Sequence, residues 1–227
     1  HFLKNKDRRL ELLVDSVLAF KNHGWIRNEP SPDAALPAQM TSSTGYTVYK
    51  YDNPQMDMTY RTSTVGCYTD IPLYWYSVIL LNYAEAKAEL GTITQDDLNK
   101  SVNLLQRRAG LPDMTTSPEA DPANNMGVSN LIWEIRRCRR CELMCDNNYR
   151  YWDLVRWHQM DKMDTNVNLN ANLGANVSNV EDADKNADGY LKGTSATRSF
   201  SAKYYHYPVP TNDITLNSQI KQNPNWD

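Results

Sequence analysis

The stretch Asn82-Tyr-Ala-Glu-Ala-Lys-Ala-Glu-Leu-Gly91 consists largely of strong helix formers and ends on a glycine. Apolar residues recur at helical spacing along it and just before it, at Ile79, Tyr83, Ala86 and Leu90. A glycine suits the left-handed backbone position that commonly follows the last helical residue. The sequence therefore predicts a helix that ends at this glycine, and the segments around it decide the fold class.

Three further segments have a helical period. Thr94, with Asp97 three residues later, resembles a capping box, and the segment that it opens ends at Gly110. Its apolar stripe is Leu98, Val102, Leu105 and Ala109. The third segment has one apolar face: Leu131, Ile135, Cys138 and Cys145. A fourth helix includes residues 153–157. Because helix pairs with short joints pack antiparallel, the sequence predicts a mainly α-helical fold with helix pairs, long irregular loops and little β-structure.

The remaining segments are predicted to be irregular. Residues 10–18 have helical spacing, although their β-branched content also allows a strand. A short strand is expected at 46–51. We predict a loop-rich region over 1–72, with ligand-facing loops, and a helical domain over 73–227. This domain carries a polar surface insertion at 164–199 and an extended tail at 204–227.

Bulk composition excludes two classes of protein. The 227 residues carry a formal charge of −3, which is too weak a field to favour nucleic acid as a partner. Mean hydropathy is −0.67, and no apolar run approaches the roughly 20 residues of a membrane-spanning helix. The chain begins at His1 without a secretory pattern, so we expect any signal or lipid-attachment segment to lie outside it.

Several short strings occur in a family-specific order. They are residues 82–91, Arg107-Arg-Ala-Gly-Leu-Pro112, Arg139-Arg140 with Glu142-Leu143, Arg150-Tyr-Trp-Asp-Leu-Val-Arg-Trp157, Tyr207-Pro-Val-Pro210, Ile214, Asn217 and Gln222-Asn-Pro-Asn-Trp226. In this order they resemble the SusD/RagB family of nutrient-binding outer-membrane lipoproteins. The resemblance covers about residues 70–227, and the family's N-terminal half is missing. Cys138 departs from the family pattern, which usually has Glu there, and residues 146–149 form a segment one residue longer than usual.

The resemblance implies a function in nutrient capture. Members of this family are lipid-anchored at the outer surface of the outer membrane, here through a missing N-terminus. They bind oligosaccharides, or peptides in RagB-like members, and deliver them to a SusC-like TonB-dependent transporter. The resemblance implies no enzyme activity and no required cofactor. A glycoside hydrolase is the alternative from another class, but it needs two carboxyl groups that flank one bond, and the sequence shows no such pair.

Loop aromatics are the candidates for ligand binding. A neutral sugar is bound by flat aromatic faces together with amide and guanidinium donors in a cleft. The irregular N-terminal region offers such a set: Trp25, Tyr46, Tyr49, Tyr51, Arg27 and Asn53. The alternative is that these rings cover the core, as most large aromatics do.

Two clusters of polar or thiol side chains are better explained by packing. The charged residues are Arg139, Arg140, Glu142, Arg150, Asp153 and Arg156, and Arg–carboxylate forks between helices explain them without catalysis. Cys138, Cys141 and Cys145 share one side of a helix, but no fourth ligand stands at zinc-motif spacing. We expect core thiols there.

One polar motif has the spacing of a calcium loop. Asp184, Asn186 and Asp188 stand at relative positions 1, 3 and 5, a glycine follows, and the carbonyl of Tyr190 is at position 7. Position 12 is Ser195 instead of a glutamate, so Ca²⁺ would need another oxygen, from Glu181 or Asp182. The alternative is a solvated turn closed by Asx side chains.

Overall fold

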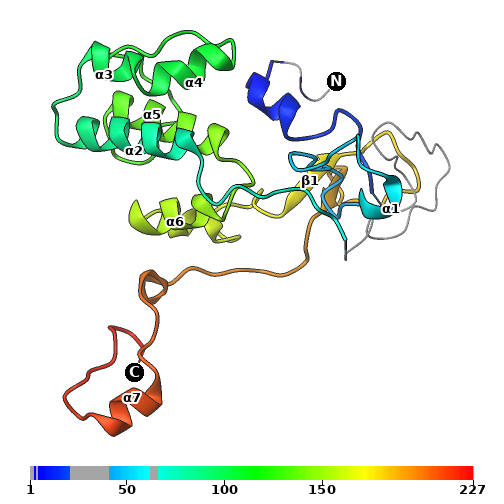
Figure 1. Cartoon of the computed structure of the whole chain (residues 1–227). Coiled ribbons are helices and arrows are strands. Elements are labelled where there is room, and N and C mark those ends of the chain that lie inside the picture. Colours follow the sequence, from blue (N-terminus) through cyan, green and yellow to red (C-terminus); the bar gives the residue numbers. More distant parts are fainter. Residues whose placement is uncertain (1–2, 4, 21–40, 62–65, 227) are drawn as a thin grey trace. The chain divides into compact units, whose positions relative to one another are not determined.

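The computed structural model describes residues 3, 5–20, 41–61 and 66–226. Within these residues the regular structure is mostly helical, with one two-stranded sheet. The chain divides into two compact units, His1–Arg150 and Tyr151–Asp227; Figure 1 shows their elements. The predicted fold class, mainly α with little β-structure, is confirmed.

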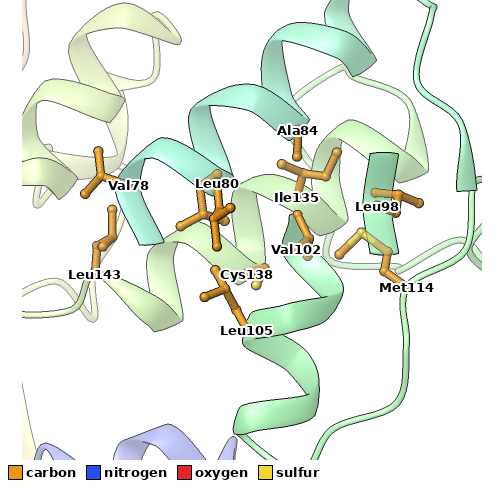
Figure 2. Packing of buried hydrophobic residues seen from close by; sticks show 11 residues of the cluster. Val78, Leu80, Ala84, Leu98, Val102, Leu105, Met114, Ile135, Cys138 and Leu143 are labelled. Carbon is orange, nitrogen blue, oxygen red and sulfur yellow. The ribbon is translucent and has the colours of Figure 1, made fainter. Parts of the chain in front are cut away.

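The core of the first unit lies among four helices: α2 (Tyr76–Glu89), α3 (Gln95–Asn99), α4 (Val102–Arg108) and α5 (Asn130–Glu142). The helix α2 packs mainly against α5, and α3 packs against α4. Figure 2 shows side chains from these helices meeting in one apolar cluster. Leu81, Leu98 and Ile135 are fully buried there. At roughly 1.5–3 kcal/mol for each large apolar side chain, this cluster is the main source of stability of the unit.

The helix α2 ends as the sequence predicts. Gly91 has φ 65°. Its amide donates to the Ala88 carbonyl at 3.0 Å, and the Thr92 amide donates to the Lys87 carbonyl at 3.0 Å. This pair of hydrogen bonds is a Schellman motif, which requires a left-handed residue and therefore favours glycine. The predicted end of this helix is confirmed.

The second predicted helix is divided in two, α3 and α4. The capping box at its start is present, because the Thr94 hydroxyl accepts from the Asp97 amide and the Asp97 carboxylate accepts from the Thr94 amide. The break is at Ser101, a buried residue with φ −129° and ψ −98°. Its hydroxyl donates to the Asp97 carbonyl at 2.6 Å. A local side-chain bond of this kind competes with the helical ladder, which explains why one continuous helix was the wrong prediction.

The apolar stripe of α2 that the sequence emphasises lies on its exposed side. Ile79 is 57% exposed, Tyr83 43% and Leu90 74%. The buried side instead carries Val78, Leu80, Leu81, Ala84 and Glu85. Both faces of α2 are thus largely apolar, so spacing alone could not identify the face that packs on the core.

The helix α5 carries basic residues that bind α2. Arg136 donates to Glu85 at 3.3 Å and to Glu89 at 2.9 Å, and Arg139 donates to the Asn82 side chain at 2.8 Å. These Arg contacts join the two helices, and of the two arginines only Arg139 belongs to the predicted charged cluster.

The predicted set of three core thiols is only partly correct. Cys138 is buried in the core cluster and Cys141 is half-buried. Cys145 lies beyond the end of α5, with φ 64°, and its side chain is exposed. The helix ends too early for Cys145 to share the apolar face, so its predicted placement is wrong.

Among the described residues before α2, the regular elements are short. The 3-10 helix η1 (Arg8–Leu12) occupies the start of the predicted helical segment, and a single bridge then pairs Val14 with Val48. The short helix α1 spans Met58–Arg61. The apolar residues of 10–18 therefore pack as a short helix followed by extended chain.

The second unit has short elements joined by loops. They are α6, which begins just before this unit (Tyr149–Arg156), η3 (Met160–Met163), β1 (Leu173–Asn176), β2 (Tyr190–Lys192), η4 (Ala202–Tyr205) and α7 (Thr211–Leu216). The strands β1 and β2 form an antiparallel hairpin within the predicted insertion. The helices η4 and α7 lie in or at the start of the segment that the sequence predicts to be an extended tail.

Candidate functional site

The nominated ligand-binding residues fall into two groups. Trp25 and Arg27 lie outside the described residues. Tyr46, Tyr49 and Tyr51 lie close together on one segment of the first unit and are half-buried. Asn53 follows two residues later and is also half-buried. The four described candidates are thus neighbours in the sequence and lie on one short segment of the first unit.

Backbone hydrogen bonds fix the position of this segment. The Asp15 amide donates to the Thr47 carbonyl at 2.9 Å, and the Tyr49 amide donates to the Leu13 carbonyl at 2.9 Å. The Tyr49 hydroxyl donates to the Glu11 carbonyl. Residues 46–49 are therefore attached along their length to residues 11–15.

A buried carboxylate anchors the next two residues. Asp146, which is 3% exposed, accepts from the Tyr51 hydroxyl at 2.5 Å and from Lys50 Nζ at 2.5 Å. Burial and this carboxylate raise the pKa of Tyr51 to about 12. The Lys50 ammonium also lies 5.2 Å from the centre of the Trp75 ring. Because the charge of Asp146 is compensated by Lys50, the cluster is stable without a ligand.

The segment closes in a turn. The Asn53 side-chain oxygen accepts from the Gln55 amide at 3.0 Å, and its carbonyl accepts from the Met56 amide at 3.0 Å. Arg61 binds the Asp52 carboxylate through two nitrogens, at 2.9 and 2.7 Å. Polar atoms of Tyr49, Tyr51 and Asn53 are thus engaged in hydrogen bonds within the protein. A ligand would meet the ring faces of the two tyrosines and the remaining polar atoms of all three side chains. Their role in ligand binding stays a prediction.

A second polar feature joins the N-terminal segment to α5. Arg9 binds Asp7 at 2.6 Å and Glu142 at 3.3 Å, and its Nη1 donates to Cys138 Sγ at 3.3 Å. The hydrogen bond from Arg9 lowers the pKa of Asp7. Asp7, Arg9 and Cys138 line a cavity of about 740 Å³ together with residues of α4, α5 and the loop that follows α4. The sequence did not predict this contact, because the partners of Arg9 in α5 lie 129 and 133 residues away.

Other carboxylates of the predicted charged cluster are bound by arginine. Glu142 also accepts from Arg108, and Asp153, which is buried, accepts from Arg156 Nε at 2.9 Å. A general acid or base must be able to exchange a proton with a substrate. The pairing of these carboxylates with guanidinium groups supports the structural interpretation of the cluster.

The candidate calcium loop forms a turn closed by its own hydrogen bonds. The Asn186 side-chain oxygen accepts from the amides of Asp188 at 3.1 Å and Tyr190 at 2.8 Å. The Tyr190 carbonyl accepts from the Asn186 amide at 2.9 Å. Across the part of the chain that the structure describes, no group of three or more His, Cys, Asp and Glu side chains is placed to hold a metal ion. A calcium site formed by Asp184, Asn186, Asp188 and Tyr190 stays a prediction.

The C-terminal strings fit together in the second unit as a clamp. The Gln222 side chain accepts from the Val209 amide at 2.7 Å and donates to the Val209 carbonyl at 2.9 Å. The Asn223 side chain donates to the Tyr207 carbonyl at 2.5 Å. Trp226 Nε1 lies within hydrogen-bond distance of the carbonyls of Lys203, at 3.1 Å, and His206, at 3.0 Å. The motif Tyr207–Pro210 and the motif Gln222–Trp226 are therefore two sides of one closed loop.

A comparison with models of protein families identifies the family to which this chain belongs. The model of the SusD family matches residues 15–226, which is nearly the whole chain. The chain belongs to the SusD family. No curated protein matches it.

Solved SusD-like structures share the fold of this chain. A SusD-like protein of Bacteroides fragilis NCTC 9343 superposes with a TM-score of 0.63 at 24% identity, over 98% of this chain and 39% of that one. A SusD-like carbohydrate-binding protein of the same organism superposes with a TM-score of 0.61 at 21% identity, over 97% of this chain and 42% of that one. The chain therefore spans about two-fifths of the length of these SusD family structures.

Within the described residues, no helix is both long enough and apolar enough to cross a membrane.

Proposed function

We propose that this chain forms part of a surface glycan-binding protein of a SusCD-type nutrient uptake system. Membership of the SusD family over residues 15–226 is the observation that carries this proposal. The protein would bind an oligosaccharide at the outer surface of the outer membrane, where a lipid anchor upstream of this chain would hold it. It would then deliver the ligand to a SusC-like TonB-dependent transporter.

The proposed ligand-facing residues are those of the N-terminal loops. Tyr46, Tyr49, Tyr51 and Asn53 lie on one segment, which is fixed by the Val14–Val48 bridge and by Asp146. A rigid segment loses little conformational entropy when a ligand binds, and this favours affinity. We include Trp25 and Arg27 in the same site because they precede this segment in the sequence.

The proposal assigns binding and no chemistry to the ligand. Three of the buried carboxylates, Glu85, Asp146 and Asp153, are paired with cations inside the protein. A glycosidase would require two carboxyl groups about 5 to 9.5 Å apart on either side of a scissile bond. The proposal therefore assigns these carboxylates a structural role inside the protein.

Calorimetric titration of the protein with neutral oligosaccharides and with peptides tests this function. We expect binding of a glycan without release of new reducing ends. Trp25→Ala and Tyr46→Ala should weaken binding by about tenfold each, because each removes one aromatic face. Tyr60→Ala is the matched control, since Tyr60 is 47% exposed and lies outside the nominated set.

Three results would contradict parts of the proposal. Binding of peptides alone would replace the glycan by a RagB-like peptide ligand. Release of reducing ends that disappears on substitution of one carboxylate would indicate a hydrolase. Glycan binding that is unchanged in both aromatic variants would remove the nominated residues from the site.

A further inference from the structure

The second unit contains a cleft that the sequence did not indicate. Its volume is about 470 Å³, within the range of pockets that bind small ligands. Five aromatic residues line it: Tyr151, Phe200, Tyr204, Tyr207 and Trp226. Tyr151 belongs to α6, and the other four come from the C-terminal segment 200–226. The cleft therefore forms only when this segment folds back on the start of the unit.

The frame behind the cleft is fixed by Tyr205. Its hydroxyl accepts from the Met160 amide at 3.1 Å, which ties η4 to η3. The Tyr205 ring stacks on His158 at 4.5 Å and meets the edge of Phe200 at 5.2 Å between centroids. These contacts hold the walls together before any ligand arrives.

Several contacts fix the orientation of Trp226, which lines the cleft. Its indole nitrogen is directed at the carbonyls of Lys203 and His206, and the Lys203 ammonium lies 4.4 Å from the ring centre. The clamp of Gln222 on Val209 closes the loop that carries it. These contacts fix the ring, and because the Lys203 ammonium lies over one face of it, a ligand would meet the part of the ring that stays exposed.

The exposed parts of the lining combine apolar faces with hydrogen-bonding groups. Tyr207 is 69% exposed and Tyr204 is 44% exposed. Polar groups at the rim are the Arg198 guanidinium, the Ser199 hydroxyl and the His206 imidazole. A hydrogen bond between the Tyr207 and Tyr151 hydroxyls raises the pKa of Tyr151. Arg198 also donates to the Asn172 side chain at 2.8 Å, and its remaining N–H groups, the Ser199 hydroxyl and the His206 imidazole suit a ligand that carries hydroxyl groups.

We propose that this cleft is a second carbohydrate-binding subsite, separate from the N-terminal loops, and that it stacks one neutral pyranose ring of a glycan. The aromatic faces would cover the C–H surface of the ring, and the rim groups would bind its hydroxyls. This proposal rests on the proposed glycan-binding function but assigns it a new place. Residues of the C-terminal signature would then have a binding role besides their structural one.

Nuclear magnetic resonance of the full chain tests the subsite. The indole N–H signal of Trp226, identified with a Trp226→Phe variant, is followed during titration with linear neutral hexasaccharides of glucose, xylose, mannose and galactose. We expect a saturable shift of this signal. Tyr207→Ala should lower the affinity reported by it about tenfold, and Tyr207→Phe, which keeps the ring, about threefold or less.

The controls separate the two proposals. Tyr74→Ala, at a tyrosine that is 82% exposed in the first unit, should leave the shift of the Trp226 signal unchanged. Protection of the Val209 amide from hydrogen exchange checks that the tail of each variant is folded. Glycan binding that moves neither the Trp226 signal nor the affinity of the Tyr207 variants would overturn the subsite and leave the proposed function intact. Absence of glycan binding would overturn both, and a shift caused only by peptides would assign the cleft to a peptide.

Discussion

The hydrogen bonds of Gln222 should keep the loop between Tyr207–Pro210 and Gln222–Trp226 closed. Its side chain takes part in three hydrogen bonds: with the Val209 amide at 2.7 Å, with the Val209 carbonyl at 2.9 Å and with the Asn223 amide at 2.9 Å. A hydrogen bond of this kind contributes about 0.5–1.5 kcal/mol net, and water replaces part of it at a half-buried site. We therefore expect Gln222→Ala to destabilise the closed loop by about 2 kcal/mol.

Hydrogen exchange at the Val209 amide measures this change directly. A loss of about 2 kcal/mol corresponds to about a 30-fold decrease in protection if exchange proceeds through opening of the loop. Gln222→Glu keeps both acceptor interactions but cannot donate to the Val209 carbonyl, so its protection should fall by a smaller factor, about fivefold. Gln219→Ala is the matched control, because Gln219 is exposed on the same segment.

The critical result is the ranking of the three variants by the hydrogen-exchange protection of the Val209 amide. If Gln222→Ala and Gln219→Ala give equal protection at Val209, the side-chain bonds of Gln222 do not hold the loop closed. If Gln222→Glu is as damaging as Gln222→Ala, the acceptor interactions contribute less than their short distances imply.

Three further predictions concern the body of the molecule. Leu81→Ala should lower the free energy of unfolding by about 3–5 kcal/mol, because Leu81 is fully buried, whereas Ile79→Ala on the outer face of the same helix should change it by less than about 1 kcal/mol; equal effects in urea unfolding would contradict the assignment of the two faces. Gly189→Ala should open the hairpin of β1 and β2, because Gly189 has φ +83° and an added Cβ would lie 2.8 Å from the Cβ and 3.0 Å from the Cα of Ser178; unchanged amide protection of Val177 would contradict this. The pKa of Tyr51 is raised from 10.0 to about 12, so its contribution to stability is fully present below pH 10 and is lost as the pH rises through about 12. The decrease in stability at alkaline pH should therefore be smaller in Tyr51→Phe. Identical pH profiles of stability in the two proteins would contradict the hydrogen bond to Asp146.

Local signals predicted the helix ends well. Gly91 and Gly110 follow the last residues of α2 and α4 with φ 65° and 67°, and both positions form the same pair of terminal hydrogen bonds. Thr94 and Asp97 form the predicted capping box. These features depend on residues within one turn of each other, so the sequence contains all that determines them.

Features that depend on tertiary partners were harder to predict. The outer and inner faces of α2 are both apolar, and only packing against α5 selects the face that includes Leu81. The break at Ser101 accompanies a local side-chain hydrogen bond to the Asp97 carbonyl, but Ser101 also fits a continuous helical pattern, so the apolar spacing did not reveal the break. The cleft lined by Tyr207 and Trp226 requires that residues distant in sequence meet, and neither periodicity nor spacing reports such a meeting.

The contact between Arg9 and α5 has a consequence for the order of folding. Arg9 and its partner Glu142 are separated by 133 residues along the chain. Ordering such a long loop costs more entropy than forming the helix pairs, whose partners are closer in sequence. We expect the pairing of α2 with α5 to come first and to create the acidic position that Arg9 then occupies. The N-terminal segment would thus be the last part of this unit to become protected as the protein refolds.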